Sequence, residues 1–138
     1  MSIPLRNAAL YAEHGTGAYP HAPALRGVLC SCGHRAFPPQ RQGCEVCGGH
    51  GDALADALFT GHGRLLSSAT VHRHGKPFPP VPFTVVSVAL DDGPVVRGLL
   101  AAASPAGLKP GTLMLTVLET VNIGDEPLRD LRFVAEGA

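Results

Sequence analysis

The feature that most constrains what this chain can fold into is its set of four cysteines, which all fall in one short stretch. They form two closely spaced pairs, Cys30-x-Cys32 and Cys44-x-x-Cys47, and a glycine follows each pair directly. A structural zinc ion binds four thiolates from two tight turns, and glycine lets the backbone bend around the sulfurs. The pattern therefore predicts a zinc ribbon whose metal ligands are Cys30, Cys32, Cys44 and Cys47.

Two other interpretations of the cysteines stay open. They could form two disulfides or remain unrelated buried thiols, although disulfides between such tightly clustered cysteines would constrain little else of the chain. His34 could replace Cys30 or Cys32 as a ligand if one of these pointed away from the metal. A site closed by four thiolates has no position for a substrate or an activated water, so the predicted zinc is structural.

The charge balance and the composition narrow the class of protein. Eleven Lys and Arg residues balance eleven Asp and Glu residues, which argues against general binding to a phosphate backbone. A hydrophobic content of 45%, with 17 Gly and 13 Pro, indicates a folded chain with many turns. The N-terminal residues lack the apolar core of a secretory signal and no later run is long enough to span a bilayer, so we expect a cytoplasmic protein.

We divide the chain into three parts. Residues 1–25 form an N-terminal extension that lies across a neighbouring surface, with a short helix expected over Ala8 to Glu13 before glycines and prolines break the chain. Residues 26–52 hold the zinc ribbon, and residues 53–138 form a barrel.

The barrel prediction rests on short β-rich runs separated by turn residues. Val85, Val88 and Val95 belong to these runs and show the β-branched enrichment of half-buried strands. The expected strands cover residues 64–73, 82–90, 94–102, 112–119 and 131–136, with a hairpin turn at Asp91-Asp92-Gly93. Five short strands without a long helix predict a mainly β chain that contains a small closed barrel of the OB type.

Catalytic candidates are few. His72-x-His74 would project two imidazoles from one face of a strand, as a metal or acid–base pair requires, but no carboxylate lies nearby in sequence. Adjacent carboxylates at Asp91 and Asp92 point apart in a turn, and Asp-Gly is ordinary hairpin chemistry. The sequence therefore predicts no catalytic residues.

Several short motifs occur in an order that resembles a known family. They are Cys32-Gly33, Phe37-Pro38-Pro39, Cys44-x-x-Cys47-Gly48, Gly61-x-Gly63, Pro80-x-Pro82-Phe83 and Leu108-x-x-Gly111. This order is similar to that of domain of unknown function number thirty-five, the acyl-CoA-associated OB-fold proteins. The chain departs from the family pattern in its first cysteine pair, which is separated by one residue where the family usually has two.

The resemblance implies a rubredoxin-like zinc ribbon followed by a five-stranded OB-type barrel. It also implies a non-catalytic accessory subunit, which binds a thiolase-like, aldolase or hydratase-like enzyme and helps to hold or channel an acyl-CoA at the interface. Catalytic residues would then belong to the partner enzyme.

One loop suggests where an acyl-CoA could be met. Between the first two expected strands, Arg73 and Lys76 could contact phosphates, and Phe78 and Phe83, among prolines, could pack on a pantetheine arm or a partner protein. The alternative is a stiff proline-rich loop with two solvated cations.

A second functional class stays open, because OB barrels often bind single-stranded nucleic acid. Such modules stack bases on exposed aromatic side chains along a basic groove. Here aromatic residues make up 5% of the chain, Trp is absent and charge is balanced, so nucleic-acid binding is the alternative rather than the main prediction.

Overall fold

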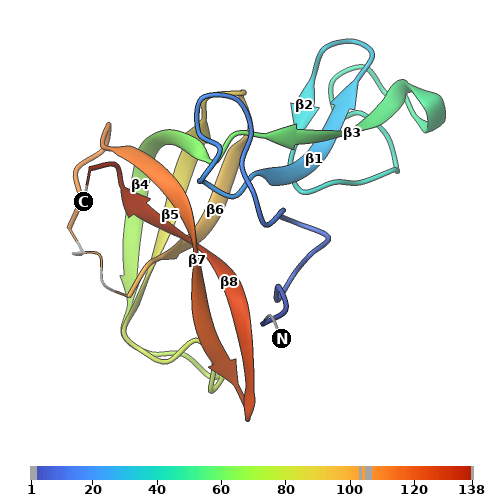
Figure 1. The fold of residues 1–138 in the computed structure, drawn as a ribbon. Helices are drawn as coiled ribbons and strands as arrows, with labels where there is room; N and C mark the ends of the chain where they lie inside the picture. The colour runs from blue at the N-terminus through green and yellow to red at the C-terminus, as the bar shows by residue number, and fades with distance from the viewer. Residues whose placement is uncertain (1–2, 103, 105–106, 138) are drawn as a thin grey trace.

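The computed structural model describes residues 3–102, 104 and 107–137, and it contains two β-sheets (Figure 1). The smaller sheet has the strand order β2-β1-β3, and the larger one is a closed barrel of order β4-β5-β6-β8-β7. The strands are β1 (Leu25–Cys30), β2 (Arg35–Ala36), β3 (Leu54–Phe59), β4 (His62–Val71), β5 (Phe83–Leu90), β6 (Val95–Leu100), β7 (Leu113–Ile123) and β8 (Glu126–Ala135). The predicted mainly β fold with a five-stranded barrel is therefore confirmed.

Alternating side chains build the core of the barrel. Along β5 the even-numbered positions from Thr84 to Leu90 are buried, while the odd-numbered ones are partly exposed. Buried side chains from all five strands meet these residues inside the barrel. They include Leu65, Val96, Met114 and Phe133. The barrel is thus a filled core rather than an open channel.

The last two strands extend further than the sequence predicted. β7 and β8 pair continuously from Met114↔Ala135 to Ile123↔Glu126, so β8 begins at Glu126 and not at residue 131. Their hairpin projects beyond the rest of the barrel (Figure 1). Its outer part has few buried side chains, and the apolar alternation that would mark a strand is therefore weak there.

The cysteines lie at one end of the smaller sheet, and the barrel lies at the other end. β1 pairs along its whole length with β3, from Leu25↔Phe59 to Cys30↔Leu54. Leu25 and Phe59 belong to the same buried cluster as the barrel core, whereas Cys30 and Leu54 belong to a separate small cluster. The boundary between residues 52 and 53 stays a prediction.

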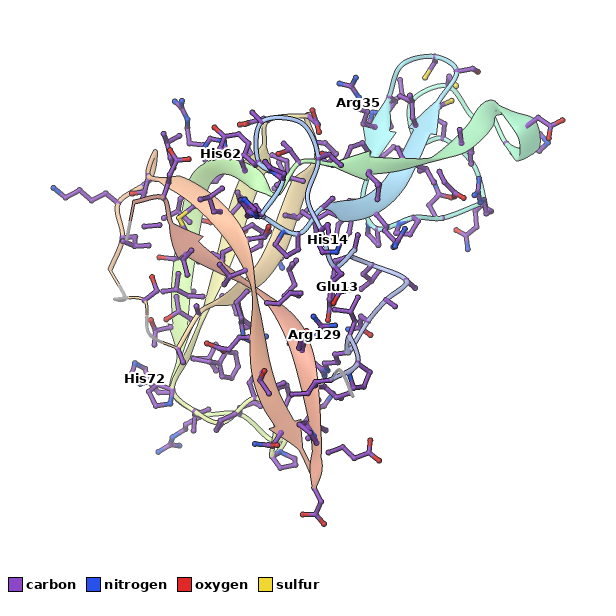
Figure 2. The ribbon with its side chains drawn as sticks, viewed as in Figure 1. Glu13, His14, Arg35, His62, His72 and Arg129 are labelled. Atoms are coloured by element: carbon purple, nitrogen blue, oxygen red, sulfur yellow. The ribbon has the colours of Figure 1, made fainter. Side chains whose placement is uncertain are left out.

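The N-terminal extension runs along β8 and β1. Leu5 forms a bridge with Arg129, and the carboxylate of Glu13 lies 2.6 Å from the Arg129 guanidinium (Figure 2). The helix expected over Ala8 to Glu13 is wrong, because the backbone there turns and the Ala12 N–H donates to the carbonyl of Ala24 at 2.8 Å. One turn remains, in which the N–H groups of Leu10 and Tyr11 donate to the carbonyl of Asn7, and pairing with Ala24 and Leu25 takes over beyond it.

Among the described residues, no helix has the length and apolar character needed to cross a membrane.

Candidate functional site

The four cysteine side chains converge on one point beside the smaller sheet. All four Sγ atoms lie within 4.8 Å of one another, with 3.5 Å between Cys30 and Cys47 and 3.7 Å between Cys32 and Cys44. Sulfurs bound tetrahedrally at the usual zinc–sulfur distance are roughly 3.8 Å apart, whereas a disulfide bond is about 2.05 Å long. All four are free thiols, and the donor set fits a tetrahedral metal ion.

Backbone N–H groups favour charge on the second cysteine pair. The N–H groups of Cys47 and Val46 lower the pKa of Cys44 to about 6. The Gly49 N–H favours the Cys47 thiolate, but hydrogen bonds to the Cys30 and Cys32 sulfurs hold its proton and raise the pKa of Cys47 to about 12. Four thiolates this close together would repel one another, so the cluster can ionise fully only when a cation lies between the sulfurs.

His34 does not join the sulfur cluster. Its Nε2 atom lies 2.8 Å from the carboxylate of Glu45, near the surface. The four cysteines are the group of potential metal ligands within the described residues, and His34 is not part of it.

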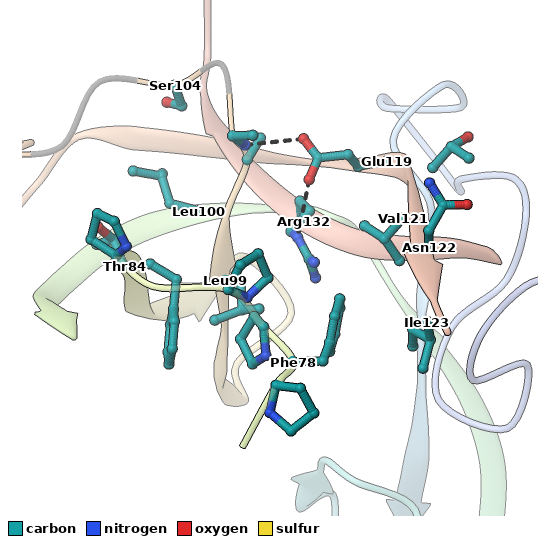
Figure 3. A pocket seen from close by; sticks show the side chains of 18 of the residues that line it. Phe78, Thr84, Leu99, Leu100, Ser104, Glu119, Val121, Asn122, Ile123 and Arg132 are labelled. Atoms are coloured by element: carbon teal, nitrogen blue, oxygen red, sulfur yellow. Dashed lines mark hydrogen bonds and ion pairs between the residues drawn. The ribbon is translucent and has the colours of Figure 1, made fainter. Parts of the chain in front are cut away.

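A groove of about 890 Å³ opens at one end of the barrel (Figure 3). It lies between the β4–β5 loop (residues 72–82) and the β7–β8 hairpin, which in OB barrels are the two loops that border the ligand-binding face. Its walls are mostly prolines and apolar side chains. The apolar lining residues include Pro77, Phe78, Pro79, Pro80, Pro82, Phe83, Leu99, Leu100, Val121 and Ile123.

Arg132 and Glu119 are the charged residues in the described lining of the groove. Arg132 is 5% exposed, its Nε donates to Glu119 at 3.3 Å, and its Nη1 pairs with Asp130. Asp130 also accepts from Nη1 of Arg6 at 3.2 Å, and Glu119 accepts from the N–H of Ala102 at 3.0 Å. Two guanidinium groups and two carboxylates therefore balance at the floor of the groove.

The structure divides the four residues predicted on the β4–β5 loop. Phe78 and Phe83 line the groove, and the guanidinium of Arg6 lies 4.8 Å above the Phe78 ring. Arg73 and Lys76 are exposed on the same loop but are not among the residues lining the groove. The aromatic pair and the cationic pair thus occupy different parts of the loop.

The histidine pair predicted on one strand face is not on a strand. β4 ends at Val71, so His72 and His74 both lie in the following loop, and His74 packs edge-on against Phe83 at 5.2 Å. The pairing of β4 with β5 ends at Val71↔Phe83 because the next partner in this register, Pro82, has no N–H to donate to a strand ladder.

Sequence reasoning missed the buried ionic network under the groove. Its members come from the N-terminal extension, β7 and β8, and Arg6 and Asp130 are 124 positions apart. A charged residue on a strand usually faces solvent, so no local pattern distinguishes Arg132 from a surface arginine.

Comparison with known proteins finds similarity in sequence and in fold. No protein-family model matches the chain. A DUF35 domain-containing scaffold protein of Pyrococcus furiosus is 29% identical over 103 residues, which cover 74% of each protein. A solved structure described as an Ltp2-ChsH2(DUF35) aldolase matches with a TM-score of 0.58 and 22% identity, over 79% of this chain and 84% of that one. The first match confirms the resemblance seen in the cysteine and glycine motifs, and the second confirms the fold.

Proposed function

We propose that this chain, which resembles the DUF35 proteins in sequence and in fold, is a non-catalytic accessory subunit of an acyl-CoA enzyme complex. The observation that carries the proposal is the similarity to a relative named as a scaffold protein. The aligned region includes most of this chain and most of that relative. The name of the solved neighbour, which joins a DUF35 component to an aldolase, supports the same role. The partner would be a thiolase-like, aldolase or hydratase-like enzyme.

The proposed metal is zinc, held by Cys30, Cys32, Cys44 and Cys47. The distances between their sulfurs fit a tetrahedral thiolate site, and zinc in such a closed site stabilises structure. Its role here would be to hold the two cysteine turns against the end of the smaller sheet.

The β4–β5 loop is the proposed contact for acyl-CoA. Arg73 and Lys76 are exposed, so their side chains can contact phosphate groups. Phe78 and Phe83 follow them in the chain, are half-buried and line the groove. A ligand with an anionic head and an apolar arm matches this order of side chains along the loop.

The groove favours this proposal over single-stranded nucleic acid. Nucleic-acid grooves of OB barrels carry cations along the backbone path. Here the charged residues in the described lining are Glu119 and Arg132, which pair with each other. A phosphate backbone would find no net positive charge along these walls.

Affinity purification of the tagged full-length protein from its native host tests the accessory role. Under mild conditions we expect a stoichiometric thiolase-like, aldolase or hydratase-like enzyme, identified by mass spectrometry, and the complex should retain acyl-CoA. The same tag on an unrelated OB-fold protein is the control. Recovery of nucleic acid or ribosomal proteins without such an enzyme would contradict the proposal, and retention on a nucleic-acid column that falls steeply with salt would identify the alternative.

A further inference from the structure

The walls of the groove suit an apolar group. Half-buried side chains from the β4–β5 loop, β6 and β7 surround it, among them Phe78, Leu99, Leu100, Val121 and Ile123. Removing such surfaces from water is favourable, and a volume of about 890 Å³ lies within the range of small-molecule sites. The groove can therefore take an elongated apolar group.

A buried hydrogen-bond donor lies at the floor of the groove. Arg132 is 5% exposed, and the hydrogen bonds of its guanidinium to described residues leave from Nε and Nη1. Figure 3 shows the guanidinium directed into the groove, on the side of Phe78. The Nη2 group makes no hydrogen bond to a described residue and is not among their fully buried unpaired atoms, so it is a donor that a ligand acceptor in the groove can reach.

The charges around Arg132 favour an uncharged acceptor. Arg132 and Arg6 are balanced by Asp130 and Glu119, all within one network of ion pairs. An additional carboxylate would be buried without a compensating cation, which is expensive. A carbonyl or hydroxyl oxygen can accept the hydrogen bond without that cost.

From these observations we infer that the groove holds the acyl part of the ligand, an elongated uncharged group whose carbonyl or hydroxyl oxygen accepts a hydrogen bond from Arg132. The inference rests on the proposed acyl-CoA function and specifies which part of the ligand this chain contacts. The groove contributes affinity for the chain, and Arg132 fixes the position of its oxygen.

Isothermal calorimetry on the full-length, zinc-loaded protein tests the groove without coenzyme A. The probes are the butyryl, hexanoyl and octanoyl thioesters of N-acetylcysteamine, together with S-octyl-N-acetylcysteamine, which lacks the carbonyl. We expect affinity to rise about two- to fourfold with each methylene buried. The octyl thioether should bind roughly tenfold more weakly than the octanoyl thioester, because it cannot accept from Arg132.

Two variants locate the binding. Val121→Asp places a charge in the apolar wall and should reduce octanoyl thioester affinity at least tenfold. Val95→Asp is the control and should leave affinity unchanged, because Val95 is 54% exposed at the start of β6 and is not part of the groove lining. Substitution of Arg132 would leave the carboxylates of Glu119 and Asp130 without their partner, so such a variant would not separate loss of binding from loss of folding. The thioester–thioether pair tests the same hydrogen bond in the unaltered protein.

Several outcomes would overturn the inference. Equal affinity for all chain lengths, equal affinity for thioester and thioether, or no effect of Val121→Asp would each do so. The inference would also fail if the protein bound no thioester and an enzyme partner protected residues 119–124 from hydrogen exchange. The groove would then be a protein-docking surface. That result would leave the accessory role intact. Thioester binding by a chain that recovers no enzyme partner would support the groove and contradict the accessory role.

Discussion

The ring of Tyr19 lies flat against the buried ring of His62, with the ring centroids 4.1 Å apart and the planes 3° from parallel. Nδ1 of His62 forms a hydrogen bond with the carboxylate of Asp91 at 2.6 Å, and Nε2 lies 2.7 Å from the carboxylate of Glu136 without hydrogen-bond geometry. Four segments that are distant in sequence therefore meet at the start of β4: the N-terminal extension, β4 itself, the β5–β6 turn and the residue after β8.

We expect His62→Phe to lower the free energy of unfolding by about 1–3 kcal/mol, because it preserves a stacking ring but removes both polar contacts. Urea denaturation measures the change. Tyr19→Phe is the matched control, since it keeps the ring on His62 and should change stability by less than about 0.5 kcal/mol. Equal effects of the two variants would show that the carboxylates contribute nothing.

Both tyrosines should ionise above pH 10 in the folded protein. Burial raises the pKa of Tyr11, with a further contribution from Asp130, and burial together with Glu136 and Asp91 raises the pKa of Tyr19. Folding thus favours the neutral phenols, so their contribution to stability is complete below pH 10 and is lost as the pH rises through the raised values. Absorbance at 295 nm follows the titration cleanly because the chain has two Tyr and no Trp. Superimposable curves in buffer and in 8 M urea would refute this prediction.

Gly61 should tolerate no side chain. A Cβ there would lie 2.0 Å from Oγ1 of Thr116 and 2.5 Å from the carbonyl of Pro23, where β4, β7 and the N-terminal extension meet. We expect Gly61→Ala to destabilise the protein by about 3 kcal/mol or more. In the β4–β5 loop a Cβ on Gly75 would meet nothing within 4 Å, so Gly75→Ala is the control and should be neutral or slightly stabilising. Thermal melts compare them, and similar melting temperatures for the two variants would contradict the packing described.

Metal removal should affect one end of the smaller sheet more than the other. Cys30, Cys44 and Leu54 form a cluster of their own, whereas Leu25 and Phe59 share the barrel core. Because metal binding energy is local folding energy, a chelator should release about one zinc per chain and speed hydrogen exchange mainly over residues 30–54. Cys44→Ser should have a similar effect without chelator. Exchange that rises equally throughout the barrel, or not at all, would be inconsistent with this division.

Removing the two loop cations should weaken acyl-CoA binding without unfolding the chain. Arg73 and Lys76 are exposed, so the double variant Arg73→Ala with Lys76→Ala should lower the affinity of the complex by roughly tenfold at low salt. Arg97→Ala with Lys109→Ala removes the same charge from exposed positions elsewhere and serves as the control. Unchanged affinity in the first double variant would remove the loop from the site.

The local patterns of the sequence were enough to predict the cysteine cluster and the barrel. Two cysteine pairs followed by glycines define tight turns, and their four sulfurs converge as the spacing requires. The β5–β6 hairpin was predicted as well, because Asp91-Asp92-Gly93 carries the turn chemistry that joins two alternating strands. These features depend on residues close together in the chain, and a single sequence contains that information.

Only the tertiary structure brought together His62 with Glu136 and Arg132 with Arg6, and only it formed the groove between the β4–β5 loop and the β7–β8 hairpin. The reason is physical: a charged or polar residue on a strand faces solvent or interior according to what packs over it, and that cover comes from distant segments. The sequence by itself therefore determined the cysteine cluster and the strand-rich barrel, while the closure of the barrel and the covering N-terminal extension decided which polar groups are buried and where the groove forms.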